Sequence, residues 1–291
     1  MTDLASEHIF NKFYPIYKII RLVVNLKEVQ VIRYSAIKKL GQNFLINREI
    51  AKAEAVHGEG RHVIELGPGP GMLTLELCKV AKSVIAIEKD SRLFSLLKST
   101  VKSKKLTVLN KDFFDVTNKE LMLGSDSIMI SNIPYNLSSS VIEWLIKNNV
   151  EAILCLQKEF VDHMLAKEGT DKYSKLSVIS RLSFSMTRIM NVGRGNFDPM
   201  PKVDSSIIYL KPKESTINDE DSNMINLLMQ HKKKTVKSSL VDSHSYLHLD
   251  KRTLSNVGSR IKGGERRLFK MSPEEMLEAA REINSMIKAS T

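Results

Sequence analysis

The chain has 291 residues, 42% of them hydrophobic, which is enough for one large α/β domain and a smaller second one. Its formal net charge of +11 favours a polyanionic partner over a small neutral one, although a merely soluble basic surface would give the same charge. The two cysteines, Cys78 and Cys155, form no C-x-x-C pair, which argues against disulfides and structural zinc and fits a reducing cytosol.

Residues 1–37 form an N-terminal extension with an apolar stretch at residues 9–34. Basic residues interrupt this stretch too often for a membrane span, and no secretory hydrophobic region is present. Acidic residues in the extension also count against a mitochondrial transit peptide. We expect an amphipathic segment that packs on the domain or on a partner, with a helix lying on RNA as the alternative.

Strand and helix patterns alternate from Arg61 onward and predict βαβ units around a mostly parallel sheet. The predicted strands are residues 62–66, 83–88, 106–109, 127–131, 152–157, 184–192 and 205–210. The predicted helices between them are residues 72–79, 91–100, 138–147, 159–167 and 176–181. The polar run 211–223 resembles a linker, and helical periodicity at 224–240 and 273–288 predicts a small helical second domain.

A glycine-rich turn follows the first predicted strand, where Glu65 is followed by Gly67, Gly69 and Gly71 before a helix begins. Such a turn lets a nucleotide-type ligand approach the backbone closely. The spacing is G-x-G-x-G, and Met72 stands where a third glycine of the G-x-G-x-x-G fingerprint would be, which argues against a dehydrogenase.

Two acidic residues follow the next two predicted strands. Glu88 ends the second strand, where an acid can accept both ribose hydroxyls, and Asp112 precedes Phe113, a pair suited to the edge and face of an adenine. Glu88 could instead be a solvated strand end, and Asp112 a turn or helix cap. Because both residues follow a G-x-G-x-G turn in the sequence, we favour the interpretation that they bind a ligand.

The segment Asn132-Ile133-Pro134-Tyr135 has the groups needed to present an exocyclic amine for methylation. An aromatic amine has its lone pair delocalised into the ring, so two acceptors that pull its hydrogens out of plane restore its nucleophilicity. Asn132 can supply a side-chain carbonyl and Ile133 a main-chain carbonyl that Pro134 holds in place, while Tyr135 supplies a face for stacking. An ordinary turn after a buried strand is the alternative.

Together these motifs resemble a class I S-adenosylmethionine-dependent methyltransferase, and more narrowly the KsgA family of small-subunit rRNA adenine dimethyltransferases. Four further segments carry the narrower resemblance: G-Q-N-F-L at 41–45, L-Q-K-E at 156–159, Y-S-K-L-S-V at 173–178 and F-D-P-M-P-K-V-D-S at 197–205. The resemblance implies an α/β fold, with a seven-stranded, mostly parallel Rossmann-like methyltransferase sheet in residues 38–212. The resemblance is faint beyond residue 210, and from the helical periodicity and basic charge we expect a small helical RNA-binding domain in residues 213–291.

The resemblance also implies S-adenosyl-L-methionine as cofactor and no metal. The cofactor-binding residues would be Asn43, Leu45, Glu65, Gly67, Gly69, Gly71, Glu88, Asp112 and Asn132. Asn132, Ile133, Pro134, Tyr135 and Phe197 would form the catalytic set, in which a flipped-out adenine is sandwiched between Tyr135 and Phe197. For Phe197, a core position before a proline-stiffened turn is the alternative. Methyl transfer would be direct, without a covalent enzyme intermediate.

The sequence departs from the family pattern at two places. Asn47 stands where the family usually has Asp, and Tyr173-Ser174-Lys175-Leu176-Ser177 stands where it has Y-G-R-L-S. Neither change removes a predicted catalytic group.

A basic run is the best candidate for RNA contacts: His231, Lys232, Lys233, Lys234 and Lys237. Apolar residues just upstream would anchor its helix, although a charge run is often only a solvated face. We therefore expect dimethylation of two adjacent adenosines in the 3′-terminal hairpin of small-subunit rRNA, by a cytoplasmic monomer that recognises the immature subunit. The alternatives are a large-subunit rRNA adenine methylase of the antibiotic-resistance type and a non-catalytic nucleic-acid-binding assembly or transcription factor.

Overall fold

The structure is a computed structural model that describes residues 42–214 and 217–290. The predicted extension, residues 1–37, lies outside the described residues, as does Gly41 of the G-Q-N-F-L motif. Contacts divide the described chain into two compact units. The first comprises residues 42–158 and 187–210, and the second comprises 159–186 and the described residues from 211 onward. The methyltransferase and RNA-binding domains, at 38–212 and 213–291, remain functional predictions.

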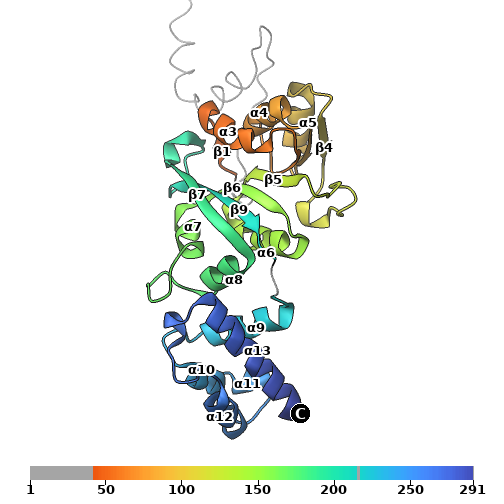
Figure 1. Ribbon diagram of the computed structural model, residues 1–291. Coiled ribbons are helices and arrows are strands. Elements are labelled where there is room, and N and C mark those ends of the chain that lie inside the picture. The colour runs from red at the N-terminus through yellow and green to blue at the C-terminus, as the bar shows by residue number, and fades with distance from the viewer. Residues whose placement is uncertain (1–41, 215–216, 291) are drawn as a thin grey trace, which may run out of the picture. The chain divides into compact units, whose positions relative to one another are not determined.

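A seven-stranded sheet with the order β4-β3-β2-β5-β6-β9-β7 confirms the predicted α/β architecture (Figure 1). Its strands are β2 His62–Leu66, β3 Ser83–Ile87, β4 Leu106–Leu109, β5 Ser127–Asn132, β6 Glu151–Gln157, β7 Phe184–Val192 and β9 Ser205–Pro212. The pairs between β4, β3, β2, β5 and β6 are parallel, whereas β9 runs antiparallel to β6. Every residue of the central strand β2 is buried, as expected for a parallel strand covered on both faces.

The helices of the first unit are α3 Arg48–Ala55, α4 Met72–Val80, α5 Ser91–Thr100 and α6 Ser138–Asn148, with short 3-10 segments at Val56–Gly58, Phe113–Asp115, Tyr135–Leu137 and Arg194–Asn196. Helix α3 was missing from the sequence prediction. It buries Ile50 and Ala51 in the same core as Val63 of β2 and Ile128 of β5, so α3 covers one face of the sheet.

A separate two-stranded sheet joins two segments that are far apart in the sequence. Strand β1, Phe44–Leu45, pairs antiparallel with β8, Phe197–Asp198, so that Leu45 lies opposite Phe197. Two strands this short are not stable alone, and their position depends on the packing of Leu45 and Phe197 into the core beneath them.

The second unit is helical: α7 Lys158–Met164, α8 Lys175–Ser183, α9 Asp219–Met229, α10 Val236–Asp242, α11 His244–Leu247, α12 Lys251–Arg260 and α13 Pro273–Ser290, with a 3-10 segment at Leu268–Lys270 (Figure 1). Its core includes Ile225 of α9, Leu240 of α10 and Ile283 of α13. Throughout residues 42–214 and 217–290, no helix has both the length and the apolar composition needed to cross a membrane.

Two boundaries in the second unit differ from the sequence prediction. The predicted linker 211–223 overlaps two regular elements, because β9 ends at Pro212 and α9 begins at Asp219. Asn218 caps the first turn of α9, and three acidic residues lie at its positive end. The predicted helical stretch 224–240 is broken between Met229 and Val236. There the Thr235 hydroxyl accepts a hydrogen bond from the Ser238 amide and starts a new helix, α10.

Candidate active site

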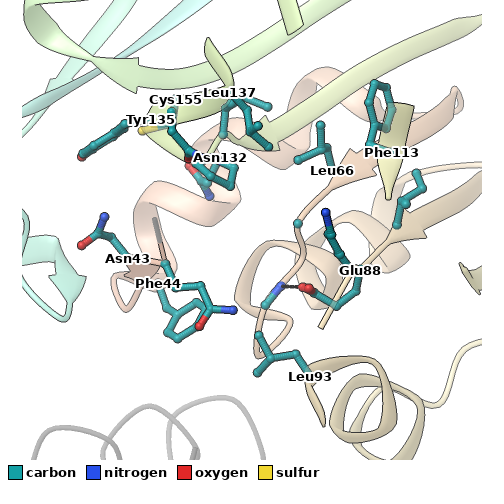
Figure 2. A pocket seen from close by; sticks show the side chains of 18 of the residues that line it. Asn43, Phe44, Leu66, Glu88, Leu93, Phe113, Asn132, Tyr135, Leu137 and Cys155 are labelled. Carbon is teal, nitrogen blue, oxygen red and sulfur yellow. Dashed lines mark hydrogen bonds between the residues drawn. The ribbon is translucent and has the colours of Figure 1, made fainter. Parts of the chain in front are cut away.

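A cavity of about 260 Å³ lies at the carboxyl ends of β2, β3 and β5, the edge at which open α/β sheets bind ligands (Figure 2). In Figure 2, Asn132 and Tyr135 lie at one end of the cavity, Glu88 and Leu93 at the other, and Asn43 and Phe44 along one side. The predicted site residues that line it are Asn43, Gly67, Gly69, Glu88, Asp112, Asn132, Ile133, Pro134, Tyr135 and Phe197. The fold thus brings most of the predicted site together.

The glycine-rich turn shapes one wall of the cavity. Gly69 has a φ of 55°, and a Cβ atom there would lie 2.7 Å from Cδ1 of Phe44. Gly71 precedes α4 with a φ of 94°, and a Cβ there would lie 2.6 Å from Cδ1 of Leu97. Both positions therefore require glycine, for conformation and for space. Of these two glycines, Gly69 lines the cavity and Gly71 does not. Gly71 instead allows the start of α4 to pack closely on Leu97 of α5.

Glu88 lies just beyond β3 and is 6% exposed. Its Oε2 accepts a hydrogen bond from the Gly69 amide at 3.1 Å, and its Oε1 accepts one from the Asp90 amide at 2.8 Å. A carboxylate offers about four acceptor positions, so about two remain for hydroxyl donors in the cavity. Burial raises the pKa of Glu88, and the two amides partly offset this effect.

Asp112 lines the cavity and accepts hydrogen bonds from two neighbouring residues, Lys89 and Phe114. Its Oδ2 accepts a hydrogen bond from Lys89 Nζ at 2.7 Å, which is the main cause of its lowered pKa. Its Oδ1 accepts one from the Phe114 amide at 3.1 Å and so caps a 3-10 segment. The cap that we considered as an alternative is therefore present, and Asp112 also faces the cavity. Beside it, Phe113 packs edge to face on Trp144, with ring centroids 4.9 Å apart.

The Asn132–Tyr135 segment begins at the last residue of β5. The Ser131 hydroxyl donates to the Leu66 carbonyl at 2.5 Å and ties the end of β5 to the end of β2. Asn132 Oδ1 is buried and has no hydrogen-bond partner among the residues that the structure describes. A buried acceptor without a donor costs about 1–3 kcal/mol, and this one lies in a cavity where a ligand can bring an N–H or O–H group to it.

Two aromatic residues, Tyr135 and Phe197, line the same cavity as Asn132. The Tyr135 hydroxyl shares a hydrogen bond with Ser205 Oγ at 2.8 Å, which fixes its ring against the start of β9. Phe197 is 5% exposed and belongs both to the cavity lining and to the core beneath β1 and β8. Phe197 is thus both a core residue, which was the alternative interpretation, and a residue of the cavity lining, as predicted.

Comparison with known proteins defines the family. The model of the family described as "Ribosomal RNA adenine dimethylase" matches residues 34–285. The chain belongs to this family.

Relatives and solved structures agree with membership of the ribosomal RNA adenine dimethylase family. A "Probable ribosomal RNA small subunit methyltransferase A" of Thermococcus kodakarensis is 39% identical over 252 residues, covering 83% of this chain and 88% of the relative. The crystal structure of a dimethyladenosine transferase from Plasmodium falciparum matches with a TM-score of 0.71 at 28% identity, covering 84% and 98% of the two chains. That of the 23S rRNA methyltransferase ErmE matches with a TM-score of 0.57 at 25% identity, covering 83% and 100%.

Two predicted cofactor-binding residues, Leu45 and Glu65, do not line the cavity. The Leu45 side chain is 4% exposed and packs in the core. Glu65 is 2% exposed within β2, where burial raises its pKa to about 8, so that the carboxyl group is largely protonated at neutral pH.

The sequence prediction also missed two residues at or near the site. Glu54 of α3 is fully buried, its two carboxyl oxygens have no partner within the described part of the chain, and burial raises its pKa well above the usual value. A correct prediction of α3 would have placed Glu54 on the buried face with Ile50 and Ala51. Cys155 lines the cavity beside Asn132, its partner in the β5–β6 register.

The predicted RNA-binding run lies in the second unit, mostly in the turn between α9 and α10. Lys232 Nζ donates to the carbonyls of Asp171 and Tyr173, each at 2.8 Å, and therefore stabilises the fold. Two other lysines of the run form ion pairs: Lys234 with Asp242, and Lys237 with Glu265 at 3.6 Å. Lys233 and His231 complete the run, and Lys233 is exposed. An RNA contact of this run remains a prediction, for which Lys233 is the best candidate.

Proposed function

We propose that the protein is an S-adenosyl-L-methionine-dependent rRNA adenine N6,N6-dimethyltransferase that modifies two adjacent adenosines in the 3′-terminal hairpin of small-subunit rRNA. We further propose that it acts as a cytoplasmic monomer on the immature subunit. The observation that carries the proposal is the buried, unpartnered Asn132 Oδ1, in the same cavity as a nearly buried glutamate with acceptor positions to spare. Family membership and the names of the relatives support the choice of rRNA adenine as substrate.

The residues of the cavity fit the proposed cofactor. Glu88 would accept the two ribose hydroxyls with its remaining lone pairs, and Asp112 would accept from the adenine amine of the cofactor. Phe113 and Leu93 supply apolar walls, and Gly67 and Gly69 leave the backbone accessible. When bound, S-adenosylmethionine supplies an electrophilic methyl group.

The Asn132–Tyr135 segment would present the target amine. Asn132 Oδ1 and the Ile133 carbonyl would each accept one amine hydrogen, which localises the nitrogen lone pair. As positive charge develops on that nitrogen, the two oxygens stabilise the transition state more than the ground state, and only such a difference accelerates the reaction. Tyr135, fixed by Ser205, and Phe197 would hold the flipped base between them.

One alternative has a specific observation in its favour, because ErmE, a 23S rRNA methyltransferase, has a similar structure. The names of the relatives, which specify the small subunit, favour the small subunit over the large one. A purely non-catalytic role gives no reason for an amine acceptor buried without a partner in a ligand cavity.

The proposal is tested by methyl transfer from labelled S-adenosylmethionine to three substrates: immature small subunits, large subunits and protein-free rRNA. Mapping of the modified nucleotides then identifies the target. We expect two adjacent dimethylated adenosines near the 3′ end of the small-subunit rRNA. Modification confined to large-subunit rRNA would support the alternative, and no transfer to any substrate would contradict the proposal.

A further inference from the structure

Asn47 and Asn196 form an amide pair that joins the two sides of the β1–β8 sheet. The Asn47 Nδ2 group donates to Asn196 Oδ1 at 2.8 Å across a sequence separation of 149 residues. Next to this bond, the Ile46 amide donates to the Asn196 carbonyl at 2.8 Å, and the Leu45–Phe197 and Phe44–Asp198 pairs extend the connection. The segment after β1 is thus attached to the segment before β8 by both side chains and main chain.

Neighbouring main-chain groups determine how both amides are oriented. Asn47 Oδ1 accepts from the amides of Glu49 and Ile50 at 3.0 and 3.4 Å and caps α3, so its Nδ2 must face away from the helix, toward Asn196. Asn196 Nδ2 donates to the Gly193 carbonyl at 2.8 Å, so its Oδ1 must face Asn47. Each amide uses its oxygen and its nitrogen in a different bond, so the pair has a single favourable arrangement.

The two segments that the pair joins form different walls of the cavity. Asn43 and Phe44 lie on the β1 side, where Phe44 packs against Gly69 of the glycine-rich turn. Phe197 lies on the β8 side, where the proposed function puts the target base. A ligand that fixes the position of β1 against Gly69 therefore also fixes the position of β8, provided that the link between the two strands is intact.

We propose that Asn47 and Asn196 are positioning residues that couple occupation of the cofactor site to the placement of Phe197 at the target base. This inference rests on the proposed function, because it requires the two walls to serve cofactor and substrate. An aspartate at position 47 could still cap α3, but it has no N–H to donate to Asn196 Oδ1.

Hydrogen exchange of residues 193–198, with and without S-adenosylhomocysteine, tests the coupling without relying on catalysis. The variants are Asn47→Asp, which keeps the helix cap but removes the donor, and Asn196→Ala, which removes the acceptor. Asn118→Ala is the matched control, because Asn118 donates to Asn148 in another amide pair at 2.8 Å that does not line the cavity. Ligand binding is followed separately by the fluorescence of Trp144, the only tryptophan, which packs on the cavity residue Phe113.

In the wild type and in Asn118→Ala, we expect the ligand to slow exchange at residues 193–198 by at least about fivefold, the lower end of ordinary coupling between sites. In Asn47→Asp and Asn196→Ala this slowing should be clearly smaller while the ligand still binds, because only the main-chain link between the two segments is left. Equal slowing in all four proteins, or none in the wild type despite binding, would overturn the inference and leave the proposed function standing. If Asn196→Ala does not fold, Asn47→Asp alone decides. Absence of binding to the wild type would overturn the proposed function, and the inference with it.

Discussion

Replacing Glu88 with glutamine tests the proposed cofactor contact with little change of shape. The wild-type carboxylate uses about two of its four acceptor positions on the Gly69 and Asp90 amides and keeps about two for the ribose hydroxyls. The glutamine has only one oxygen, with two acceptor positions. Its NH2 group would face one of the two main-chain amides, which is itself a donor and cannot bond to it. Either a main-chain amide or a ribose hydroxyl must then lose its acceptor.

The magnitude follows from the charge of the group. A hydrogen bond to an ionised group contributes about 1.5–3 kcal/mol, so Glu88→Gln should weaken binding of S-adenosylhomocysteine by about 10- to 150-fold. Isothermal titration calorimetry measures this directly. Asp250→Asn is a suitable control, because Asp250 also accepts from two main-chain amides but caps α12 in the second unit, away from the cavity lining.

The pH dependence gives a second test on the same protein. Burial raises the pKa of Glu88, so the carboxylate takes up a proton at a higher pH than an ordinary glutamate. Since only the ionised form keeps all its acceptor positions, wild-type affinity should fall as the pH is lowered from 7 toward 5, and Glu88→Gln should lack this component. An unchanged affinity of Glu88→Gln at pH 7 would refute the ribose role.

Three further predictions concern other residues. Glu65→Gln should flatten the pH dependence of stability in urea unfolding. Wild-type Glu65 has a folded-state pKa of about 8 and an ordinary value of 4.5, so its contribution to stability is fully present below pH 4.5. That contribution is lost as the pH rises through 8, at roughly 1 kcal/mol per pH unit. Equal slopes of stability against pH in the wild type and the variant would contradict the burial effect. Tyr135→Phe keeps the ring but loses the bond to Ser205, so kcat/KM should fall only about fivefold, and a loss as large as in Tyr135→Ala would contradict a stacking role. Lys233→Ala should reduce the slope of log affinity for rRNA against log salt concentration by roughly 0.7–0.9, whereas an unchanged slope would exclude a phosphate contact.

The sheet and most of the cavity could be predicted from sequence because their signals are local. Strands such as Ser127–Asn132, with Ile128, Met129 and Ile130 in succession, contain short apolar runs, and Gly69 is required by the backbone conformation. The order of the motifs then placed Glu88 and Asn132 at the same edge of the sheet.

The features that sequence missed depend on contacts between distant segments. Strands β1 and β8 have two residues each, too few for any periodic pattern, and are defined only by their pairing. Helix α3 contains Glu54 on its buried face, where a charged residue conceals the apolar periodicity. The break before α10 depends on the Thr235 cap, which interrupts a stretch whose apolar spacing alone suits one helix.

The central claim is that Asn132 accepts the target amine, and a single-turnover methyl-transfer measurement on Asn132→Ala tests it most directly. With saturating enzyme, labelled S-adenosylmethionine and immature small subunits, the rate should fall by at least about 100-fold, as for loss of a group that stabilises charge in the transition state. Calorimetry on the same variant should show affinity for S-adenosylhomocysteine within a few-fold of the wild type. Transfer at near the wild-type rate, with the cofactor product still bound, would contradict the account.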